Sequence, residues 1–370
     1  MDRESKEQPR WIAGVAPAPE LRHLTMTALF EKECREQPAV LAELLRAYQT
    51  GHSIRSQLQA LQASTRHAGS TGPVLFIGMG ASYCSSISAT TWLQANGCSA
   101  FSVDAGEWLH YAAPVWHQPA LSVLVTTSGE SAELVELFKK NPGNPSALIC
   151  NNEKSTCWSL AANKLPILAG PEYGNATKTY TNATAAGIIL ASTLLNKEWS
   201  SDAKLTLDAY LAVLDRIFSL RQQLAEFSQG AATLELIGRG PCHGSALMGA
   251  LCIREMAGLR AVGHSGAGFR HGPLLDVDSS HLAIIFALGR AARLGVKLAE
   301  DCNQRGGKVI LVSTEPHKPA DKLLPIQIAP VPEPWECLTS VLIPQAITLA
   351  FIEKHGAKLA PRFQYGAMIE

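Results

Sequence analysis

No sign of charge dominates this sequence of 370 residues. Lysine plus arginine number 32, aspartate plus glutamate also number 32, and no basic block stands out along the chain. A protein that binds the phosphate backbone of a nucleic acid needs a basic face. The sequence therefore predicts no nucleic-acid partner.

Long hydrophobic runs are also missing. No uninterrupted apolar stretch reaches the roughly 18 residues that suggest a membrane-spanning helix. The first residues, MDRESKEQPRW, contain no apolar segment of the kind found in signal peptides. We therefore expect no membrane partner and no secretion, and we place the chain in the cytoplasm.

Paired cysteine motifs are absent as well. The nine cysteines are odd in number and scattered, and no two of them form a CxxC pair, so neither a disulfide framework nor a zinc site is indicated. We expect most of them to be small buried hydrophobic residues in a reducing compartment. No other cluster of metal-binding residue types is seen, and we expect no metal.

An internal repeat is the clearest feature that the sequence does contain. Gly78 and Gly238 are 160 residues apart, and so are Gly129 and Gly289. Three pairs of apolar runs surround or follow these glycines: VLFIGMGAS (74–82) with LELIGRGPC (234–242), LSVLVTTSGES (121–131) with LAIIFALGRAA (282–292), and ALICN (147–151) with ILVST (310–314).

The repeated runs are rich in Val, Ile and Leu without polar alternation, which is typical of strands covered on both faces. Helix-like segments lie between them, at 83–95, 131–140, 243–257 and 291–304. Alternating strands and helices predict parallel sheets with right-handed crossovers. The expected fold class is α/β, with two duplicated doubly wound domains, each a parallel sheet flanked by helices.

This repeat divides the chain into four parts. Helical periodicity further predicts a helical arm at 24–48, a connection at 205–229 and a closing helix at 337–353. The parts are an N-terminal tail and helical arm (1–49), a first domain (50–215), a second domain (216–350) and a C-terminal tail (351–370).

Both Gly-x-Gly turns follow a strand and precede a helix, which invites a dinucleotide-binding interpretation. The third glycine of the G-x-G-x-x-G motif is replaced by Tyr83 in one copy and by His243 in the other. No acidic residue is convincingly placed at the end of the next strand. We therefore expect no nicotinamide or flavin cofactor.

Hydroxyl side chains gather at the predicted strand ends of the first domain. Ser82 follows one strand, and Thr126, Thr127, Ser128 and Ser131 follow the next. Ligands of open α/β sheets bind beyond the carboxyl ends of the strands, where hydroxyl groups and free N–H groups at a helix start can hold a phosphate. Each motif alone is more typical of helix capping than of ligand binding. Their occurrence at two successive strand ends favours phosphate binding.

Five motifs in this order resemble the sugar isomerase (SIS) domain family, in tandem. They are GMGASY, TTSGESAE, GPEYGNATKTYT (170–181), LIGRG followed by a helix ending in REM, and FRHGPLLDVD, and they span about residues 30–370. The resemblance is to the isomerase part of glucosamine-6-phosphate synthase and to its shorter relatives. These relatives include aminosugar-phosphate deaminases and the deglycases that split phosphorylated Amadori compounds.

The resemblance implies a role for each matching residue. Glu255 would be the base that moves a proton between C1 and C2, and His271 would assist ring opening. In relatives this histidine reaches the active site of the neighbouring subunit, which implies a homodimer with shared active sites. The five hydroxyl residues would bind the sugar phosphate: Ser82, Thr126, Thr127, Ser128 and Ser131.

These residue types suit that chemistry. Opening a pyranose ring moves a proton between the ring oxygen and the anomeric hydroxyl, which an imidazole near its pKa can do. Moving a proton between adjacent carbons requires a carboxylate above the plane of an enediol or enolamine. On spacing alone, the same residues are as typical of a solvated helix end and a loop.

Several features depart from the synthase. Only some 50 to 70 residues precede the first domain, and Asp2 follows Met1 where a glutaminase has a nucleophilic cysteine, so we expect no glutaminase activity. By counting, a glutamate and a lysine of the synthase become Met248 and Cys252. No lysine follows Lys358 to form a Schiff base with a ketose.

What remains suits a substrate that already carries nitrogen. We expect a C–N-cleaving deaminase or deglycase that acts on an aminosugar phosphate or a fructosamine-type Amadori sugar. The C-terminal tail is expected to close its active site. An aldose–ketose phosphosugar isomerase and a non-catalytic phosphosugar sensor are the alternatives. Because phosphate binding rests on hydroxyl groups and not on a basic clamp, an unphosphorylated substrate also stays open.

Overall fold

The structure is a computed structural model that describes residues 24–67, 72–140 and 146–357. Most of the predicted N-terminal tail lies outside the described residues, and so does Lys358 with the rest of the predicted C-terminal tail. Residues 351–355 of that tail belong to the last helix. The closing of the active site by the tail stays a prediction.

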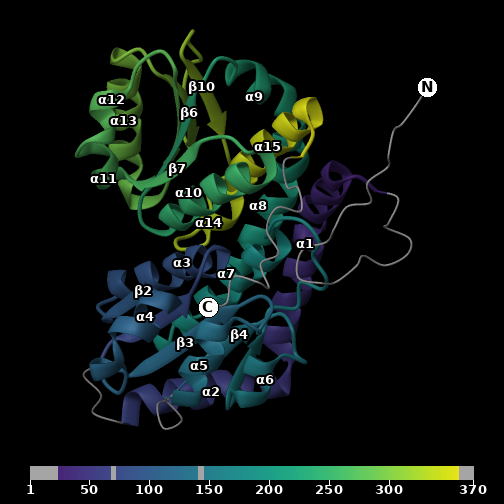
Figure 1. Cartoon of the computed structure of the whole chain (residues 1–370), viewed down its shortest axis with the longest axis vertical. Helices are drawn as coiled ribbons and strands as arrows, with labels where there is room; N and C mark the ends of the chain where they lie inside the picture. Colours follow the sequence, from purple (N-terminus) through teal and green to yellow (C-terminus); the bar gives the residue numbers. More distant parts are fainter. Residues whose placement is uncertain (1–23, 68–71, 141–145, 358–370) are drawn as a thin grey trace.

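Two five-stranded parallel sheets form the framework of the two halves of the molecule (Figure 1). The strands of the first sheet are β1 (Val74–Gly78), β2 (Ala100–Asp104), β3 (Leu121–Thr126), β4 (Ser146–Cys150) and β5 (Asn163–Pro166). Those of the second sheet are β6 (Thr233–Gly238), β7 (Ala261–Ser265), β8 (His281–Ala287), β9 (Lys308–Ser313) and β10 (Leu323–Gln327).

The two sheets have the same topology. The strand order is β2-β1-β3-β4-β5 in the first and β7-β6-β8-β9-β10 in the second, and all neighbours are parallel. The central strands β1, β3 and β8 are almost entirely buried, because helices cover both of their faces. The predicted α/β class and the duplicated doubly wound sheets are confirmed.

The duplication extends to the backbone at the strand ends. Gly80 and Gly240, the last residues of the two Gly-x-Gly turns, have φ angles of 52° and 55°. Gly129 and Gly289 have φ angles of 69° and 60°. Side chains other than glycine rarely adopt such angles, which explains why the same glycines recur in both halves.

Helices flank the sheets on both sides. The first-half helices are α1 (Met26–Thr50), α2 (His52–His67), α3 (Ala81–Ala95), α4 (Ala105–Tyr111), α5 (Ala132–Lys140), α6 (Thr156–Leu160) and α7 (Lys178–Leu194), with the 3₁₀ turn η3 (Ala113–Val115). The connecting and second-half helices are α8 (Ser200–Ser219), α9 (Arg221–Phe227), α10 (Pro241–Cys252), the π-helical turn η4 (Ile253–Ala257), α11 (Gly266–Arg270), α12 (Pro273–Asp276), the 3₁₀ turn η5 (Gly289–Ala291), α13 (Ala292–Gln304), α14 (Glu336–Ser340) and α15 (Leu342–His355).

The helices differ from expectation at several places. The closing helix expected at 337–353 lies in α14 and α15, and α7 was not predicted. The segment 205–229, predicted as one helix, lies in α8 and α9. The segment 243–257 is α-helical only as far as Cys252, continues as η4, and is closed by Gly258 in the left-handed conformation. The structure has the helix α2 at residues 52–67, where the sequence predicts none because few of these residues are apolar.

The two halves meet through α3 and α10, which pack against each other between the sheets (Figure 1). Both helices consist largely of small residues, ASYCSSISATTWLQA and PCHGSALMGALC, which lets their backbones come close. A Cβ atom on Gly244 would lie 2.6 Å from the carbonyl oxygen of Cys84. One hydrophobic cluster extends through both halves, and each half has a further cluster of its own.

The two helices run in opposite directions. Gly80, at the start of α3, lies next to Leu251 near the end of α10. Gly240, at the start of α10, lies next to Thr91 near the end of α3. Each helix therefore presents its end to the strand-end turn of the other half.

The apolar stretch at the C-terminal side belongs to the core. Residues Glu336–His355 are long and apolar enough to cross a membrane by length and composition alone, yet 89% of the window is buried inside the structure. α15 packs against α9, α10 and α1, as a core helix does.

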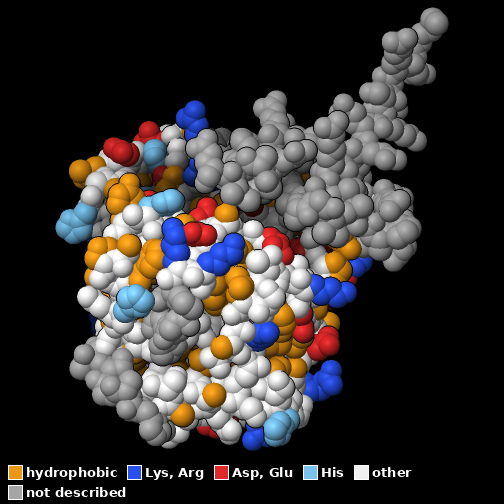
Figure 2. Space-filling view, turned by 60° about the horizontal axis from the view of Figure 1, so that its bottom comes forward, with side chains coloured by type: hydrophobic (Ala, Val, Ile, Leu, Met, Phe, Trp, Pro, Cys, Tyr) orange, Lys and Arg blue, Asp and Glu red, His pale blue; other side chains and the backbone are white. Residues whose placement is uncertain are grey.

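The burial of the cysteines and the mixture of charges on the surface agree with what the sequence predicts. Eight of the nine cysteines are buried and all nine are free thiols, so the expectation of small buried residues is confirmed. Acidic and basic side chains are interspersed on the face drawn in Figure 2, outside the grey atoms.

Candidate active site

The carboxyl ends of β1 and β3 form the switch point of the first sheet. These two strands are neighbours, and the chain leaves β1 toward β2 on one side and β3 toward β4 on the other. Ligands of doubly wound sheets bind in the crevice at such a point. The predicted hydroxyl residues lie here, Ser82 at the start of α3 and the others between the end of β3 and the start of α5.

Two of the hydroxyl groups stabilise the loop itself. Thr126 Oγ1 accepts a hydrogen bond from the N–H of Gly129 at 3.1 Å, and Ser128 Oγ accepts one from the N–H of Glu130 at 3.2 Å. These bonds are the capping contacts that the sequence pattern also allowed. They fix the loop that carries Thr127 and Ser131.

The other three hydroxyl groups are available to a ligand. Ser82, Thr127 and Ser131 are partly exposed, and their side chains make no hydrogen bond to any residue that the structure describes. The helix start beside Ser82 has no side-chain cap, because Gly80 occupies the N-cap position. An uncapped helix N-terminus with free hydroxyl groups can hold an anion.

Glu255 comes to this place from the second half. It is partly buried in η4, beyond Leu251, which lies beside Gly80 at the start of α3. Burial raises the pKa of the Cys84 thiol in the first turn of α3 to about 12, and the nearby charge of Glu255 contributes to this shift. The Glu255 carboxylate and Ser82 therefore lie in the same region. Single π-helical turns are frequent at functional sites.

Asn175 is a site residue that the sequence did not reveal. Its amide Nδ2 donates a hydrogen bond to Glu255 Oε2, and the residue is only 2% exposed. Because a carboxylate can only accept, the amide nitrogen has to face it and Oδ1 has to point elsewhere. Oδ1 is buried and has no hydrogen-bond partner among the residues that the structure describes. The only signal in the sequence was its place in the motif GPEYGNATKTYT.

Two glutamates hold the loop that carries Asn175. Glu33 of α1 accepts hydrogen bonds from the N–H groups of Tyr173 and Gly174. Burial, followed by the charge of Glu172, raises the pKa of Glu33 to about 8. Glu172 accepts from the backbone N–H groups of residues 177–179 at the start of α7, where a helix favours negative charge.

Lys178 completes this anchor. It is 5% exposed, forms a salt bridge with Glu36 of α1 at 2.8 Å, and donates to the carbonyl oxygen of Pro171 at 2.9 Å. Its contacts tie the loop to α1.

His271 lies at the other end of α10 from Glu255. It is exposed at the end of α11, which follows β7 at the carboxyl edge of the second sheet. α10 starts at this same edge and its 12 residues span about 18 Å, with Glu255 beyond the far end. In Figure 1, α11 and α12 lie on the outer side of the second half. One chain does not bring the two predicted catalytic side chains together.

Two residues that differ from the synthase, and Phe269 of the FRHGP motif, pack in the interior. Met248 and Cys252 are each 1% exposed, and Phe269 is fully buried with its ring 5.4 Å from that of His264. Phe269 is thus a loop anchor. Within 24–67, 72–140 and 146–357, no group of three His, Cys, Asp or Glu side chains could hold a metal ion.

A hollow lies elsewhere on the surface. It measures about 640 Å³ and lies between α9 and α15, with Arg221 and Glu353 among its lining residues. None of the predicted site residues lines it. Its lining side chains form ordinary surface contacts, such as the 3.0 Å salt bridge between these two residues.

Both halves of the chain match a known protein family. The SIS domain family matches the chain twice, at residues 70–193 and 229–352, which is more than half of its length. A glutamine–fructose-6-phosphate aminotransferase (isomerizing) from Zymomonas mobilis is 29% identical over 302 residues, which are 77% of this chain and 49% of that protein. The chain thus spans about half the length of this curated relative.

Solved structures share the fold. The C-terminal domain of glucosamine-fructose-6-phosphate aminotransferase from Francisella tularensis superimposes with a TM-score of 0.78 at 19% identity, covering 90% of this chain and 97% of that one. Glucosamine-6-phosphate deaminase from Thermotoga maritima superimposes with a TM-score of 0.64 at 17% identity, covering 84% and 97%. With the two family matches lying on two sheets of identical strand order, the chain belongs to the SIS (sugar isomerase) domain family.

Proposed function

We propose that the chain is a cytoplasmic enzyme that cleaves the C–N bond of an aminosugar phosphate or a fructosamine-type Amadori sugar. The observation that carries the proposal is the position of Glu255. Its carboxylate accepts a hydrogen bond from Asn175, and its charge acts on the Cys84 thiol in the first turn of α3, the helix whose start carries Ser82. This supports the proposal that a proton-transferring group lies beside an anion-binding site at the ends of β1 and β3.

The sugar phosphate would be bound through its phosphoryl group. Ser82, Thr127 and Ser131 donate hydroxyl hydrogen bonds, and Thr126 and Ser128 keep the loop in shape. The backbone N–H groups at the start of α3 add to the attraction for an anion. The carbons of the open-chain sugar then lie toward the Glu255 end of the crevice.

With an aminosugar phosphate, Glu255 takes the proton from C2 of the open-chain aldehyde and an enolamine forms. Return of the proton to C1 gives an imine at C2. Water adds to this imine, the C–N bond breaks, and a ketose phosphate and ammonia are released. The chain of steps needs no oxidant and no enzyme lysine.

With an Amadori compound the proton moves in the opposite direction. Glu255 takes the proton from C1, which carries the amine, and an enolamine forms again. Return of the proton to C2 gives an imine at C1, and its hydrolysis releases an aldose and the free amine. The leaving amine is ammonia in one case and a substituted amine in the other.

His271 would act in the active site of a second copy of the chain. It is exposed and lies beyond the opposite end of α10 from Glu255 of its own chain. We propose a homodimer in which His271 of one copy opens the sugar ring bound at Glu255 of the other. An imidazole is suited to move the proton from the anomeric hydroxyl to the ring oxygen.

A product assay on two substrates tests the proposed reaction. Ammonia and fructose 6-phosphate are measured from glucosamine 6-phosphate, and free amine and glucose 6-phosphate from a phosphorylated Amadori compound. The unphosphorylated Amadori compound is a third substrate, which tests the need for the phosphoryl group. A glutamine hydrolysis assay is expected to be negative.

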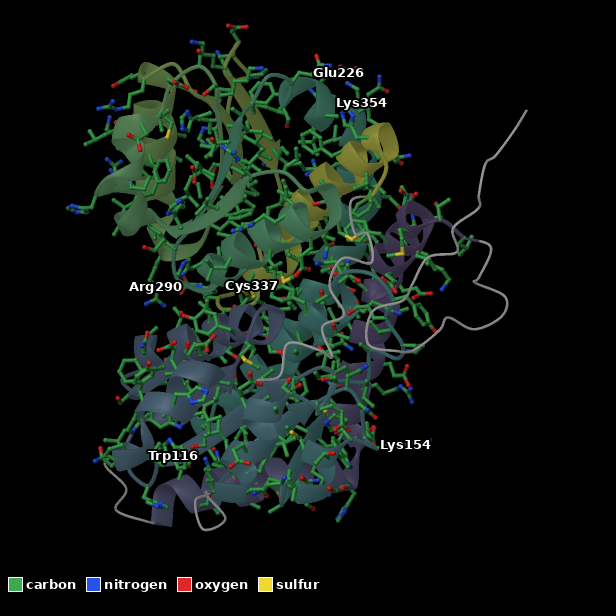
Figure 3. The ribbon with its side chains drawn as sticks, in the orientation of Figure 1. Trp116, Lys154, Glu226, Arg290, Cys337 and Lys354 are labelled. Atoms are coloured by element: carbon green, nitrogen blue, oxygen red, sulfur yellow. The ribbon has the colours of Figure 1, made fainter. Side chains whose placement is uncertain are left out.

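The variant Glu255→Gln is expected to lower kcat by at least about 100-fold, because the amide cannot accept the proton. The matched control is Glu226→Gln, an exposed glutamate of α9 (Figure 3), which should leave kcat unchanged. If Glu255→Gln releases amine as fast as the wild type, Glu255 is not the base. Interconversion of aldose and ketose phosphates without amine release would identify an isomerase instead, and binding without any turnover a sensor.

A further inference from the structure

His271 lies between two helices that are too short to hold their own shape. α11 has five residues and α12 has four, and helices of this length are not stable on their own in water. The histidine itself is exposed, and α11 lies beside α13 on the outer side of the second half (Figure 1). Its position therefore depends on the contacts that its neighbours make with the rest of the second half.

The first of these contacts is made by Phe269, two residues before the histidine. Its side chain is fully buried in the hydrophobic cluster of β6, β8, β9 and α13. Its ring meets the edge of His264 on β7, whose Nε2 lies 2.7 Å from Oε2 of Glu235 on β6. Apolar burial is not directional. Phe269 therefore fixes where α11 lies but not the direction in which its last residues point.

Arg270, the residue directly before His271, makes a directional contact. Its Nη2 lies 2.7 Å from Oδ2 of Asp301 on α13, and both side chains are partly buried. The other oxygen of Asp301, Oδ1, lies 3.2 Å from Nζ of Lys297. Hydrogen bonds between charged groups are short and depend on direction. This pair ties the end of α11 to one place on α13.

The chain turns immediately after His271. Gly272 has a φ angle of 139°, which side chains other than glycine rarely adopt. Beyond the turn, Nη1 of Arg305, at the end of α13, donates a hydrogen bond to the carbonyl oxygen of Leu275 at 3.3 Å. His271 is thus the exposed residue of a turn that is attached to α13 on both sides.

We propose that Asp301 is a positioning residue for ring opening, which acts through Arg270 on the backbone that presents His271 to the active site of the second copy. The inference rests on the proposed function, because it requires His271 to open the sugar ring. Ion pairs near the surface add little to the stability of a fold. Loss of Asp301 should therefore leave the chain folded and displace His271, and a displacement of about 1 Å can slow a catalysed step about 100-fold.

Two forms of each substrate separate ring opening from the later steps. A phosphorylated Amadori compound without the hydroxyl group at C5 stays open-chain, because its O6 carries the phosphoryl group. For an aminosugar phosphate, the 4,5-dideoxy compound stays open-chain for the same reason. Amine release from the ordinary and the open-chain form is measured for each variant relative to the wild type. Impaired folding lowers both rates equally, so the ratio reports ring opening alone.

Asp301→Asn should lower kcat/KM for the cyclic form about tenfold or more and leave that for the open-chain form nearly unchanged. His271→Asn should show the same pattern more strongly, whereas Glu255→Gln should lose both activities. The matched control is Glu300→Gln, which removes the neighbouring carboxylate of α13 that also pairs with Lys297, at 3.3 Å. It should behave as the wild type.

Arg270→Gln tests the route from Asp301 to the histidine. Combined with Asp301→Asn it should be no worse than either variant alone, because both break the same contact. Equal losses on the two forms in Asp301→Asn, or losses that add in the double variant, overturn the positioning role and leave the proposed reaction standing. A wild type that releases no amine from any of these compounds overturns the proposed reaction, and this inference with it.

Discussion

Asn175 joins two parts of the candidate active site. Its amide nitrogen donates a hydrogen bond to one oxygen of Glu255, while its own Oδ1 is buried and has no partner in the described part of the chain. Leaving a buried acceptor unsatisfied costs about 1–3 kcal/mol. A hydroxyl or amine group of a bound substrate would satisfy this oxygen, so Asn175 both orients the base and contacts the reacting end of the sugar in our proposal.

Truncation of this side chain tests that role. Asn175→Ala should lower kcat by about 10- to 100-fold, because Glu255 loses the donor that orients it. KM should change less, since the phosphoryl group is held at the other end of the crevice. Asn163→Ala, a truncation of a partly buried asparagine on β5, is the control. If kcat falls equally in the two variants, the loss reflects disturbed packing and not a role of Asn175 in orienting Glu255.

Single residues were predictable where their spacing along the chain carried the signal. The five hydroxyl residues lie at the ends of β1 and β3 and Glu255 lies at the end of the helix after β6, as the sequence indicates, while their gathering in one site stays a prediction. Asn175 was not predictable, because its contact joins residues 80 positions apart and an asparagine in a loop has many uses. The pairing of His271 with Glu255 rests on a second copy of the chain and stays a prediction.

The close contact of α3 and α10 depends on a glycine within a helix. Gly244→Ala should lower the free energy of unfolding by about 1–2 kcal/mol, because the new Cβ would lie 2.6 Å from the carbonyl oxygen of Cys84. Urea denaturation measures this. Gly187→Ala in α7, where the nearest atom would be 3.4 Å away, should be neutral or gain up to about 1 kcal/mol. A neutral Gly244→Ala would contradict the close approach.

The contact between α1 and the 170–177 loop should make stability depend on pH. The pKa of Glu33 is raised from 4.5 to about 8, so its contribution to stability is complete below pH 4.5 and is lost as the pH rises toward 8. This group should cost the wild type on the order of a few kcal/mol between pH 5 and 8.

The variant Glu33→Gln has no proton to lose, so its free energy of unfolding should fall less over the same range. Denaturation at pH 5, 6, 7 and 8 gives the two slopes. Glu43→Gln replaces an exposed glutamate of the same helix and should keep the wild-type slope. Parallel curves for the wild type and Glu33→Gln would contradict the raised pKa.

Among the elements, the central strands could be predicted and the edge strands could not. β1, β3, β6 and β8 are apolar runs because both of their faces are covered. β2, β5, β7 and β10 lie at the edges of the sheets and include exposed or half-buried residues, so no apolar run marks them. The break between α8 and α9 likewise could not be predicted, because no proline or glycine marks it.

The proposed dimer can be tested on the whole molecule. Glu255→Gln and His271→Asn should each be inactive, yet co-expression of the two variants should restore activity. With random pairing, half of the dimers are mixed and each has one intact site, so about a quarter of the wild-type activity is expected. Glu255→Gln co-expressed with the wild type is the reference for pairing. No restoration would place both residues of a site in the same chain.

The way the two halves meet was not predictable from the sequence. The repeat of about 160 residues revealed two similar domains but not which of their surfaces touch. The small residues of α3 and α10 do carry a signal for close packing, but alanine, serine and glycine are also common in helices that make no such contact. A cavity of about 80 Å³ at the turns after β6 and β8 lies between the two halves, follows from this packing and was equally hidden.

Because α3 and α10 run in opposite directions, the strand-end turns of each half are completed by the other half of the chain. Leu251 of α10 lies beside Gly80 at the start of α3, and Thr91 and Trp92 of α3 line the cavity at the turns after β6 and β8. Neither half, cut out alone, would retain a complete binding site. The duplicated fold thus has two unlike sets of strand-end turns, and a change at the end of one helix can alter one set while the other keeps its shape.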